Sequence, residues 1–555
     1  MLNMRFLLSS LLIVLLFNCK NNESRQAISE TDSDLSAISS KDFREFKVLD
    51  SKYINKDELW QPFEKDLEDF TEEIYNSIKP LILEQDIPTI QNHILNQKLT
   101  YEQLVKFYLY RIRKYDRENA LSLNSVISLN TNVMEKARSA DKVKEVYGNS
   151  DSKERFTHSV FGMPILLKDN INTTGIPTTA GAVALQNNNA EDAYIVKRLK
   201  EKGAIILGKV NLSEWAYFFC GDCPSGYSAI GGQTLNPYGR RIMDTGGSSS
   251  GSGVAVAVNF CVAAIGSETS GSILSPSSQS SVVGLKPTIG LVSRSGIVPI
   301  SSTLDTAGPM TKNVVDNAIL LDAIFGFDNN DSKSINPKWH NTFYSDNLKI
   351  DNLKGKRFGA PKRLLEDSLY IQAISDLKSK GAVIVEIEEE KIDLPDFIRL
   401  LNLDMKVDLS SYLKNYADTS ILVKSVEDII DFNKKDSINT MPYGQKLFEG
   451  IVSDRATEEE FKDIKETLKT NGRQYFDIPF ETYNLDGFLS INNYHASFAA
   501  VAEYPAITVP MGYSPKGEPK GFTFISTPFS EKKLLQWAYI YEQVSKQRKA
   551  PMHYD

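Results

Sequence analysis

Residues 246–276 read GGSSSGSGVAVAVNFCVAAIGSETSGSILSP, and this stretch decides the fold class. A loop of glycine and serine over 246–253 leads into a helical segment at 254–259, and an apolar strand follows at 261–265. The strand then enters a second turn of small residues, 266–272. Buried strands that alternate with helices are typical of an α/β fold with a largely parallel or mixed sheet.

The same alternation continues on the N-terminal side of this stretch. Residues 161–167 form a short apolar run that predicts a buried strand. A helix is expected over 192–202, where Gly203 ends it, and a strand over 204–207. Further upstream, Thr100 and Gln103 form a capping box before a helix with one apolar face, made by Leu104, Phe107, Tyr108 and Ile112.

The first 42 residues predict an export signal and a tether. The apolar run at 6–17 is too short to span a bilayer and suits a signal-peptide core. It ends in Leu-Phe-Asn-Cys, which resembles a bacterial lipobox, so residues 1–18 are expected to be a lipoprotein signal peptide and Cys19 the lipidated residue. An ordinary secretory signal and a short membrane anchor are the alternatives. Residues 19–42 are polar and predict a flexible tether.

The remaining chain, 43–555, is expected to fold as one domain with its core at about 160–312. The region at about 326–482 is more charged and is interpreted as a variable cap or an insertion on that core. The composition, with 41% hydrophobic residues, is that of a globular protein. A net charge of −8 argues against a nucleic-acid partner, which would require a basic face.

Three pieces of the core carry residues suited to chemistry. Lys168 ends an apolar strand, where burial favours the neutral amine that can act as a base, although most lysines in such positions simply reach solvent. The 246–253 loop lacks the lysine that a phosphate-binding P-loop needs. The 266–272 turn can point successive backbone N–H groups at one spot, as in an oxyanion hole.

In this order the three pieces resemble the amidase signature family, and the similarity extends over roughly 95–543. The resemblance implies a central mixed β-sheet flanked by helices on both faces and hydrolysis of a carboxamide through an acyl-enzyme. It assigns the nucleophile to Ser272, the bridging serine after a cis peptide bond to Ser248, and the base to Lys168, joined in one hydrogen-bonded chain. The oxyanion and substrate positions fall on Gly247, Thr269, Ser270 and Gly271.

The chain looks closest to the bacterial peptide amidase branch of that family. This likeness implies C-terminal amides of peptides, or small amides, as substrates, and neither a cofactor nor a metal. Two positions depart from the family pattern: Ser270 stands where most members have glycine or aspartate, and Leu274 where many have arginine.

Three other interpretations are weighed against this one. Residues 247–251 also match the G-x-S-x-G nucleophile elbow, with Ser249 as nucleophile and His340, His495 or His553 as its partner. A non-catalytic binding lipoprotein would be expected to have lost the nucleophile or the base. Transamidation in tRNA charging is set aside because an exported chain meets no tRNA.

The Cys220 and Cys223 pair has the spacing of a zinc or redox motif. Zinc would need two further ligands, so a small structural disulfide or two free thiols are favoured, and a redox centre is the remaining alternative. The expected location follows from the lipobox: a lipoprotein that faces the periplasm or cell surface and meets the membrane only through its lipid.

Overall fold

A computed structural model describes residues 45–147, 156–335 and 343–554 of the chain. The predicted signal peptide, tether and Cys19 lie outside the described residues, as does His340. Residues 43–555 form one compact unit. Within the described part, no helix combines the length and the hydropathy needed to cross a bilayer.

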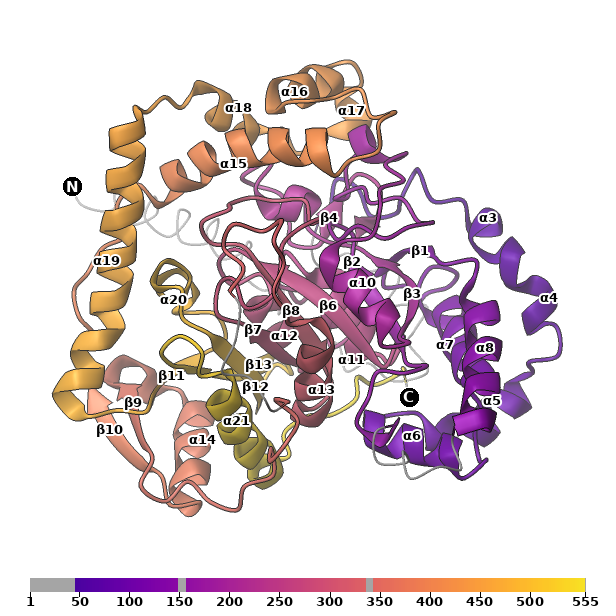
Figure 1. The fold of residues 1–555 in the computed structure, drawn as a ribbon, viewed down its shortest axis with the longest axis horizontal. Coiled ribbons are helices and arrows are strands. Elements are labelled where there is room, and N and C mark those ends of the chain that lie inside the picture. The colour runs from indigo at the N-terminus through magenta and orange to yellow at the C-terminus, as the bar shows by residue number, and fades with distance from the viewer. Residues whose placement is uncertain (1–44, 148–155, 336–342, 555) are drawn as a thin grey trace, which may run out of the picture. The chain divides into compact units, whose positions relative to one another are not determined.

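An eleven-stranded mixed β-sheet forms the centre of this unit (Figure 1). Parallel pairing joins β2 to β3 and β6, and β9 to β10 and β11, while the other neighbours are antiparallel. Across the sheet the strands are β1 (Val126–Leu129), β3 (Ile205–Val210), β2 (Pro164–Lys168), β6 (Ala263–Glu268), β8 (Thr306–Thr311), β7 (Val283–Lys286), β12 (Ala506–Tyr513), β13 (Pro519–Ile525), β11 (Gly487–Ile491), β9 (Arg357–Pro361) and β10 (Val383–Ile387).

Helices pack against this sheet, among them α11 on β6, α13 on β8, and α12 and α21 on β12. The α-helices are α3 (Lys56–Trp60), α4 (Glu64–Leu67), α5 (Glu72–Ile78), α6 (Ile87–Leu95), α7 (Tyr101–Tyr115), α8 (Val133–Tyr147), α10 (Tyr194–Glu201), α11 (Ser250–Ala257), α12 (Leu274–Gln279), α13 (Val314–Ile324), α14 (Ser368–Ser379), α15 (Phe397–Asn415), α16 (Val426–Lys434), α17 (Ser437–Thr440), α18 (Lys446–Ser453), α19 (Glu458–Tyr483), α20 (Ala496–Ala502) and α21 (Glu531–Ser545). The predicted α/β class with a central mixed sheet is confirmed.

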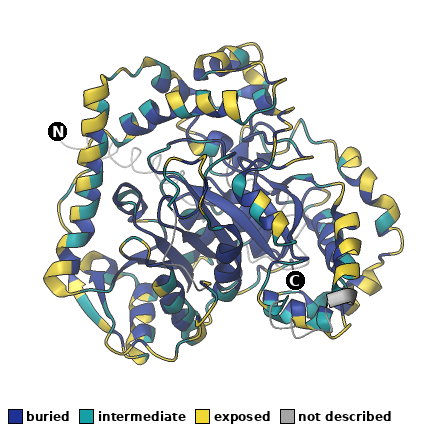
Figure 2. Cartoon of the chain, in the orientation of Figure 1, coloured by how far each residue is buried: buried dark blue, intermediate teal, exposed yellow. Residues whose placement is uncertain are grey.

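Burial explains why the predicted strands form where they do. Every residue of β2, β3 and β6 is buried, as expected for parallel strands covered on both faces (Figure 2). Gly203, with a φ of +77°, lies in the turn that follows α10 and leads into β3. The capping box predicted at the start of α7 is present, since Thr100 and Gln103 bond each other's backbone N–H groups.

Several boundaries differ from the sequence prediction by a few residues, and the start of α11 differs most. Helix α11 begins at Ser250, four residues before the predicted start, so half of the glycine and serine loop is helical. The small residues are needed for packing: a Cβ at Gly251 would lie 2.4 Å from the carbonyl oxygen of Asn211, and one at Gly253 2.8 Å from that of Pro276. These contacts let the first turn of α11 lie close to neighbouring backbone.

The region at 326–482 contributes to the sheet and to a helical layer. Strands β9 and β10 extend the sheet at one edge. Helices α15 to α18 lie together at the top of Figure 1, and α19 runs down one side. Helix α19 packs against α20 and α15. This region therefore shares the central sheet as well as adding helices beside it.

Candidate active site

Lys168 is the last residue of β2, and its side chain is fully buried. Because β2 and β6 are parallel neighbours, their carboxyl ends meet at one edge of the sheet. The Lys168 Nζ therefore lies 3.1 Å from the carbonyl oxygen and 2.9 Å from the Oγ of Ser267, near the end of β6. Its third hydrogen-bond neighbour is Ser248 Oγ, at 2.7 Å.

Burial changes the protonation of this lysine. Loss of hydration disfavours the ammonium and lowers the Lys168 pKa to about 7, against the opposing pull of Asp305 and Glu268. In a substantial fraction of the molecules Lys168 is therefore neutral at neutral pH. The neutral amine has a lone pair with which to take a proton.

Ser248 lies in the loop before α11, and the peptide bond between Gly247 and Ser248 is cis. Its carbonyl oxygen accepts a hydrogen bond from the backbone N–H of Ser213. A Cβ at residue 247 would lie 2.6 Å from Ser213 Oγ, so only glycine fits there. The loop is thus held against a neighbouring segment, with the Ser248 side chain turned to Lys168.

Ser272 closes the turn between β6 and α12. Its carbonyl oxygen accepts a hydrogen bond from the N–H of Ser249, which joins the two serine-bearing segments. The Glu268 carboxylate accepts from the N–H groups of Ile273 and Leu274, at 2.7 and 3.0 Å, and so fixes the residues just after the serine. Leu274 thus helps to fix this turn through its backbone N–H.

The hydroxyl of Ser272 makes no hydrogen bond within the described ranges, and the residue keeps 9% of its surface exposed. Of the expected chain of three side chains, the structure forms the link from Lys168 to Ser248 and has the cis bond, whereas the link from Ser248 to Ser272 is not formed. Catalytic hydrogen bonds are often loose without substrate and tighten when it binds. The Ser272 hydroxyl is therefore free to reorient.

The turn before Ser272 presents backbone donors. Gly271 has a φ of +85°, and a Cβ there would lie 2.9 Å from the side-chain nitrogen of Asn493. Within the described part of the chain, the N–H groups of Ser270, Gly271 and Ser272 donate no hydrogen bond. Three unused donors on one tight turn have the arrangement that an oxyanion requires.

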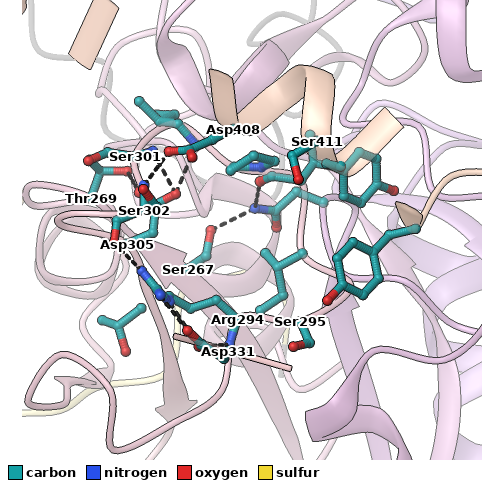
Figure 3. Close-up of a pocket in the computed structure, with 18 of the residues that line it drawn as sticks. Ser267, Thr269, Arg294, Ser295, Ser301, Ser302, Asp305, Asp331, Asp408 and Ser411 are labelled. Atoms are coloured by element: carbon teal, nitrogen blue, oxygen red, sulfur yellow. Dashed lines mark hydrogen bonds and ion pairs between the residues drawn. The ribbon is translucent and has the colours of Figure 1, made fainter. Parts of the chain in front are cut away.

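A pocket of about 160 Å³ opens beside these residues (Figure 3). Ser267 and Thr269 lie in its wall, so it adjoins both the lysine and the turn. Helix α15 contributes Asp408, Ser411 and Tyr412 to the lining. The charged region at 326–482 therefore lines this pocket.

The sequence reasoning missed Ser267, which bonds Lys168, and Asn170, which bonds Ser267. Asn170 Nδ2 donates to Ser267 Oγ at 2.9 Å, so Asn170, Ser267 and Lys168 form one buried network. Asn170 follows Lys168 by two residues and lies in the turn after β2, where the N–H of Ile171 donates to the Lys168 carbonyl. Its closeness to Lys168 in the sequence was the available signal, whereas the contact with Ser267 depends on the pairing of β2 with β6.

The nucleophile-elbow alternative does not fit this geometry. Ser249 Oγ donates to the carbonyl oxygen of Ser267 at 3.0 Å and accepts from its N–H at 3.2 Å. His495 bonds to Ser490 Oγ at 2.6 Å and Glu389 Oε1 at 2.8 Å, and not to Ser249. A loop, not a strand, precedes Ser249. The hydroxyl of Ser249 thus holds two backbones together.

Cys220 and Cys223 form a disulfide, so they are not the two free thiols that their spacing also allowed. Cys261 is a buried free cysteine in the strand region. Among the residues that the structure describes, no group of three or more His, Cys, Asp or Glu side chains is placed to hold a metal ion.

The chain thus combines an α/β fold around a mixed sheet with a buried lysine–serine pair that lies near a turn of unpaired N–H groups. Residues 103–473 match the Amidase family, and the chain belongs to the amidase signature family. It is an enzyme that hydrolyses amides.

Several relatives support this membership over most of the chain. A protein of Arabidopsis thaliana named as a probable amidase is 36% identical over 484 residues. The match covers 85% of this chain and 92% of the Arabidopsis protein. The crystal structure of an amidase family protein from Bacillus anthracis has a TM-score of 0.84 and 37% identity, covering 91% of this chain and 99% of its own. The native peptide amidase of Stenotrophomonas maltophilia has a TM-score of 0.78 and 37% identity. The match covers 85% of this chain and 99% of the peptide amidase.

Proposed function

We propose that the chain hydrolyses a carboxamide through an acyl-enzyme on Ser272, with Ser248 and Lys168 as the proton relay. The Ser272 hydroxyl attacks the amide carbonyl carbon while its proton passes to Ser248, whose own proton passes to Lys168. The N–H groups of the turn stabilise the oxyanion. On collapse, the C–N bond breaks and Ser248 returns a proton to the leaving amine. Water then cleaves the ester by the same relay.

The observation that carries this proposal is the set of contacts at Lys168 Nζ. A neutral amine has two hydrogens and one lone pair, and Nζ has three neighbours. The carbonyl of Ser267 can only accept, and the Ser267 hydroxyl oxygen takes the second hydrogen. The lone pair is then left for the O–H of Ser248, as the relay requires. Ser248 Oγ keeps a free lone pair with which to receive the proton of Ser272.

Replacement of the nucleophile is the direct test. Ser272→Ala should abolish amide hydrolysis and labelling by a fluorophosphonate, because the attacking oxygen is gone, while circular dichroism shows an intact fold. Ser249→Ala is the matched control, since it removes a hydroxyl of the same size from the neighbouring segment. It should keep the label. Labelling that survives in Ser272→Ala and disappears in Ser249→Ala would establish the elbow mechanism instead.

For the substrate we propose C-terminal carboxamides of peptides, with small linear amides as the simpler members of the class. The support is the structural neighbour that is named a peptide amidase and is similar over nearly its whole length. Ammonia release from a panel of peptide amides and simple amides tests this directly. Faster turnover of simple amides than of every peptide amide would contradict the peptide assignment.

We further propose that the enzyme is exported and held at the membrane by a lipid on Cys19. The lipobox-like end of the apolar run supports this. The Cys220–Cys223 disulfide is also in keeping with an oxidising compartment, where such bonds persist.

A further inference from the structure

The pocket beside Ser267 carries an excess of negative charge. The ionisable groups that line it are the carboxylates of Asp305, Asp331 and Asp408 and the guanidinium of Arg294 (Figure 3). One positive charge against three negative ones leaves a net charge of −2 on the wall when all are ionised. A bound molecule therefore meets an acidic environment next to the reactive residues.

Arg294 forms its direct ion pair with Asp331 and acts on Asp305 and Asp408 only from a distance, without a hydrogen bond to either. Its Nε donates to Asp331 Oδ2 at 2.9 Å, its Nη2 binds the other oxygen of Asp331, and its Nη1 binds the Ser302 carbonyl. Asp305 is held by the Thr269 hydroxyl and by two backbone N–H groups, at Ile300 and Ser301. Both groups are thus built into the wall.

Asp408, on α15, is the carboxylate without a counter-ion. It accepts a hydrogen bond from the Ser302 N–H at 2.6 Å and another from the Ser302 side chain, and it pairs with no Lys, Arg or His of the described chain. Its neighbour Asp404 binds Lys465 at 3.1 Å. Burial raises the Asp408 pKa to about 6, and Asp404 adds to the rise, so the group is still mostly ionised at neutral pH. A partly buried charge of this kind is costly unless something pairs with it.

A second observation at the same pocket calls for a donor. Asn170 lines the pocket, is 2% exposed, and donates twice through Nδ2, to Ser267 Oγ and to the Val298 carbonyl. Its Oδ1 accepts no hydrogen bond from the residues that the structure describes. Buried amide oxygens are normally paired, so the wall of this pocket holds an acceptor whose partner is missing.

We infer that the pocket receives a cationic group of the substrate, an ammonium or a guanidinium, and that Asp408 is the residue that selects for it. The inference rests on the proposed amide hydrolysis at Ser272, since it concerns the substrate of that same site. Ionised Asp408 supplies the missing countercharge, and N–H donors of the cation reach the acceptors of the wall. The substrate class is then an amide with a basic side chain or a free amine near the scissile carbonyl.

The test compares N-acetyl-argininamide with N-acetyl-citrullinamide, because citrulline keeps the shape of arginine and lacks its charge. In the full-length enzyme, kcat/KM for ammonia release should be about tenfold or more higher for the arginine compound, mainly through KM. Asp408→Asn should bring the ratio of the two close to one, and Asp408→Glu should keep most of it. Asp431→Asn, on the exposed face of α16, makes the same change of net charge and should keep the full ratio.

Equal turnover of the two amides by the unchanged enzyme overturns the inference, as does an Asp408→Asn enzyme that is folded and keeps the ratio. Should Asp408→Asn fail to fold, Ser411→Lys places a cation at an exposed position of the same wall and should lower the ratio by itself. Calorimetric binding of both amides to Ser272→Ala separates the two proposals. If no amide is hydrolysed, the proposed function fails, and the difference in binding still decides on the pocket.

Discussion

At the scale of single residues, the proposed chemistry depends on whether Lys168 is charged. Only the neutral amine can accept a proton, and its pKa is lowered to about 7 by burial. The hydrogen bonds to Ser267 hold the amine beside Ser248 in either state, so protonation, rather than position, decides the activity. This differs from hydrolases in which an imidazole is the base.

The pH dependence follows with a definite sign. Activity should fall as the pH decreases through about 7, because Lys168 takes up a proton, and should rise towards mildly alkaline pH. Lys168→Ala should lower kcat by roughly 10²-fold to 10⁴-fold, the usual contribution of a positioned base, and flatten the acid limb. The pH profile of kcat/KM on one good amide substrate is the measurement.

His495→Ala is the control for that limb. His495 is buried and bonded to Ser490 and Glu389, and burial lowers its pKa as well. The acid limb should persist in this variant, since the histidine does not touch the reacting groups. An acid limb that vanishes with His495 and survives in Lys168→Ala would contradict the lysine relay.

At the scale of elements, helix α20 connects the helical layer to the turn that precedes Ser272. Ser497 on α20 lies 3.0 Å, Oγ to Oγ, from Ser270 in the turn. Helix α19 packs closely on α20 at Gly472, where a Cβ would lie 2.4 Å from the Val501 side chain and 2.8 Å from the Ala502 backbone nitrogen. The position of α20 therefore depends on the absence of a side chain at residue 472.

Two glycine substitutions separate packing from helix propensity. Gly472→Ala should lower the free energy of unfolding by about 1–3 kcal/mol, because backbone atoms must move to admit the methyl group. Gly450→Ala on α18 should be neutral or stabilising by up to about 1 kcal/mol, since its Cβ meets only Asn402 at 3.9 Å. Urea denaturation of both variants is the measurement. Equal effects at the two positions would show that the α19–α20 contact is not tight.

At the scale of the whole molecule, the question is how the enzyme is held in place. If Cys19 carries a diacylglycerol, Cys19→Ala should move the enzyme from the membrane fraction to the soluble one, because the acyl chains supply the membrane affinity. Fractionation of cells followed by immunoblotting measures this. Membrane association that is the same in Cys19→Ala and in the unchanged protein would favour an ordinary anchor over the lipid. Asp431→Asn, a change at an exposed side chain, is the control for expression.

Much of the local structure was accessible from the sequence because short-range rules govern it. The periodicity of apolar residues and the flanking glycines predicted strands β2, β3 and β6 and helices α7 and α10 close to their observed positions. The spacing of Lys168, Ser248 and Ser272 indicated the family, which the comparisons confirm. The roles given to these three residues stay predictions.

Only the tertiary structure decided which distant segments meet at the site. Pairing of β2 with β6 brings Ser267 to Lys168, although the two residues are 99 positions apart in the sequence. Folding of α15 over the pocket places Asp408 beside Ser302. Periodicity reports which face of an element is buried, but not which other element buries it. Those long-range contacts arise from packing of the whole chain, and they determine the surroundings of the residues that the sequence alone had singled out.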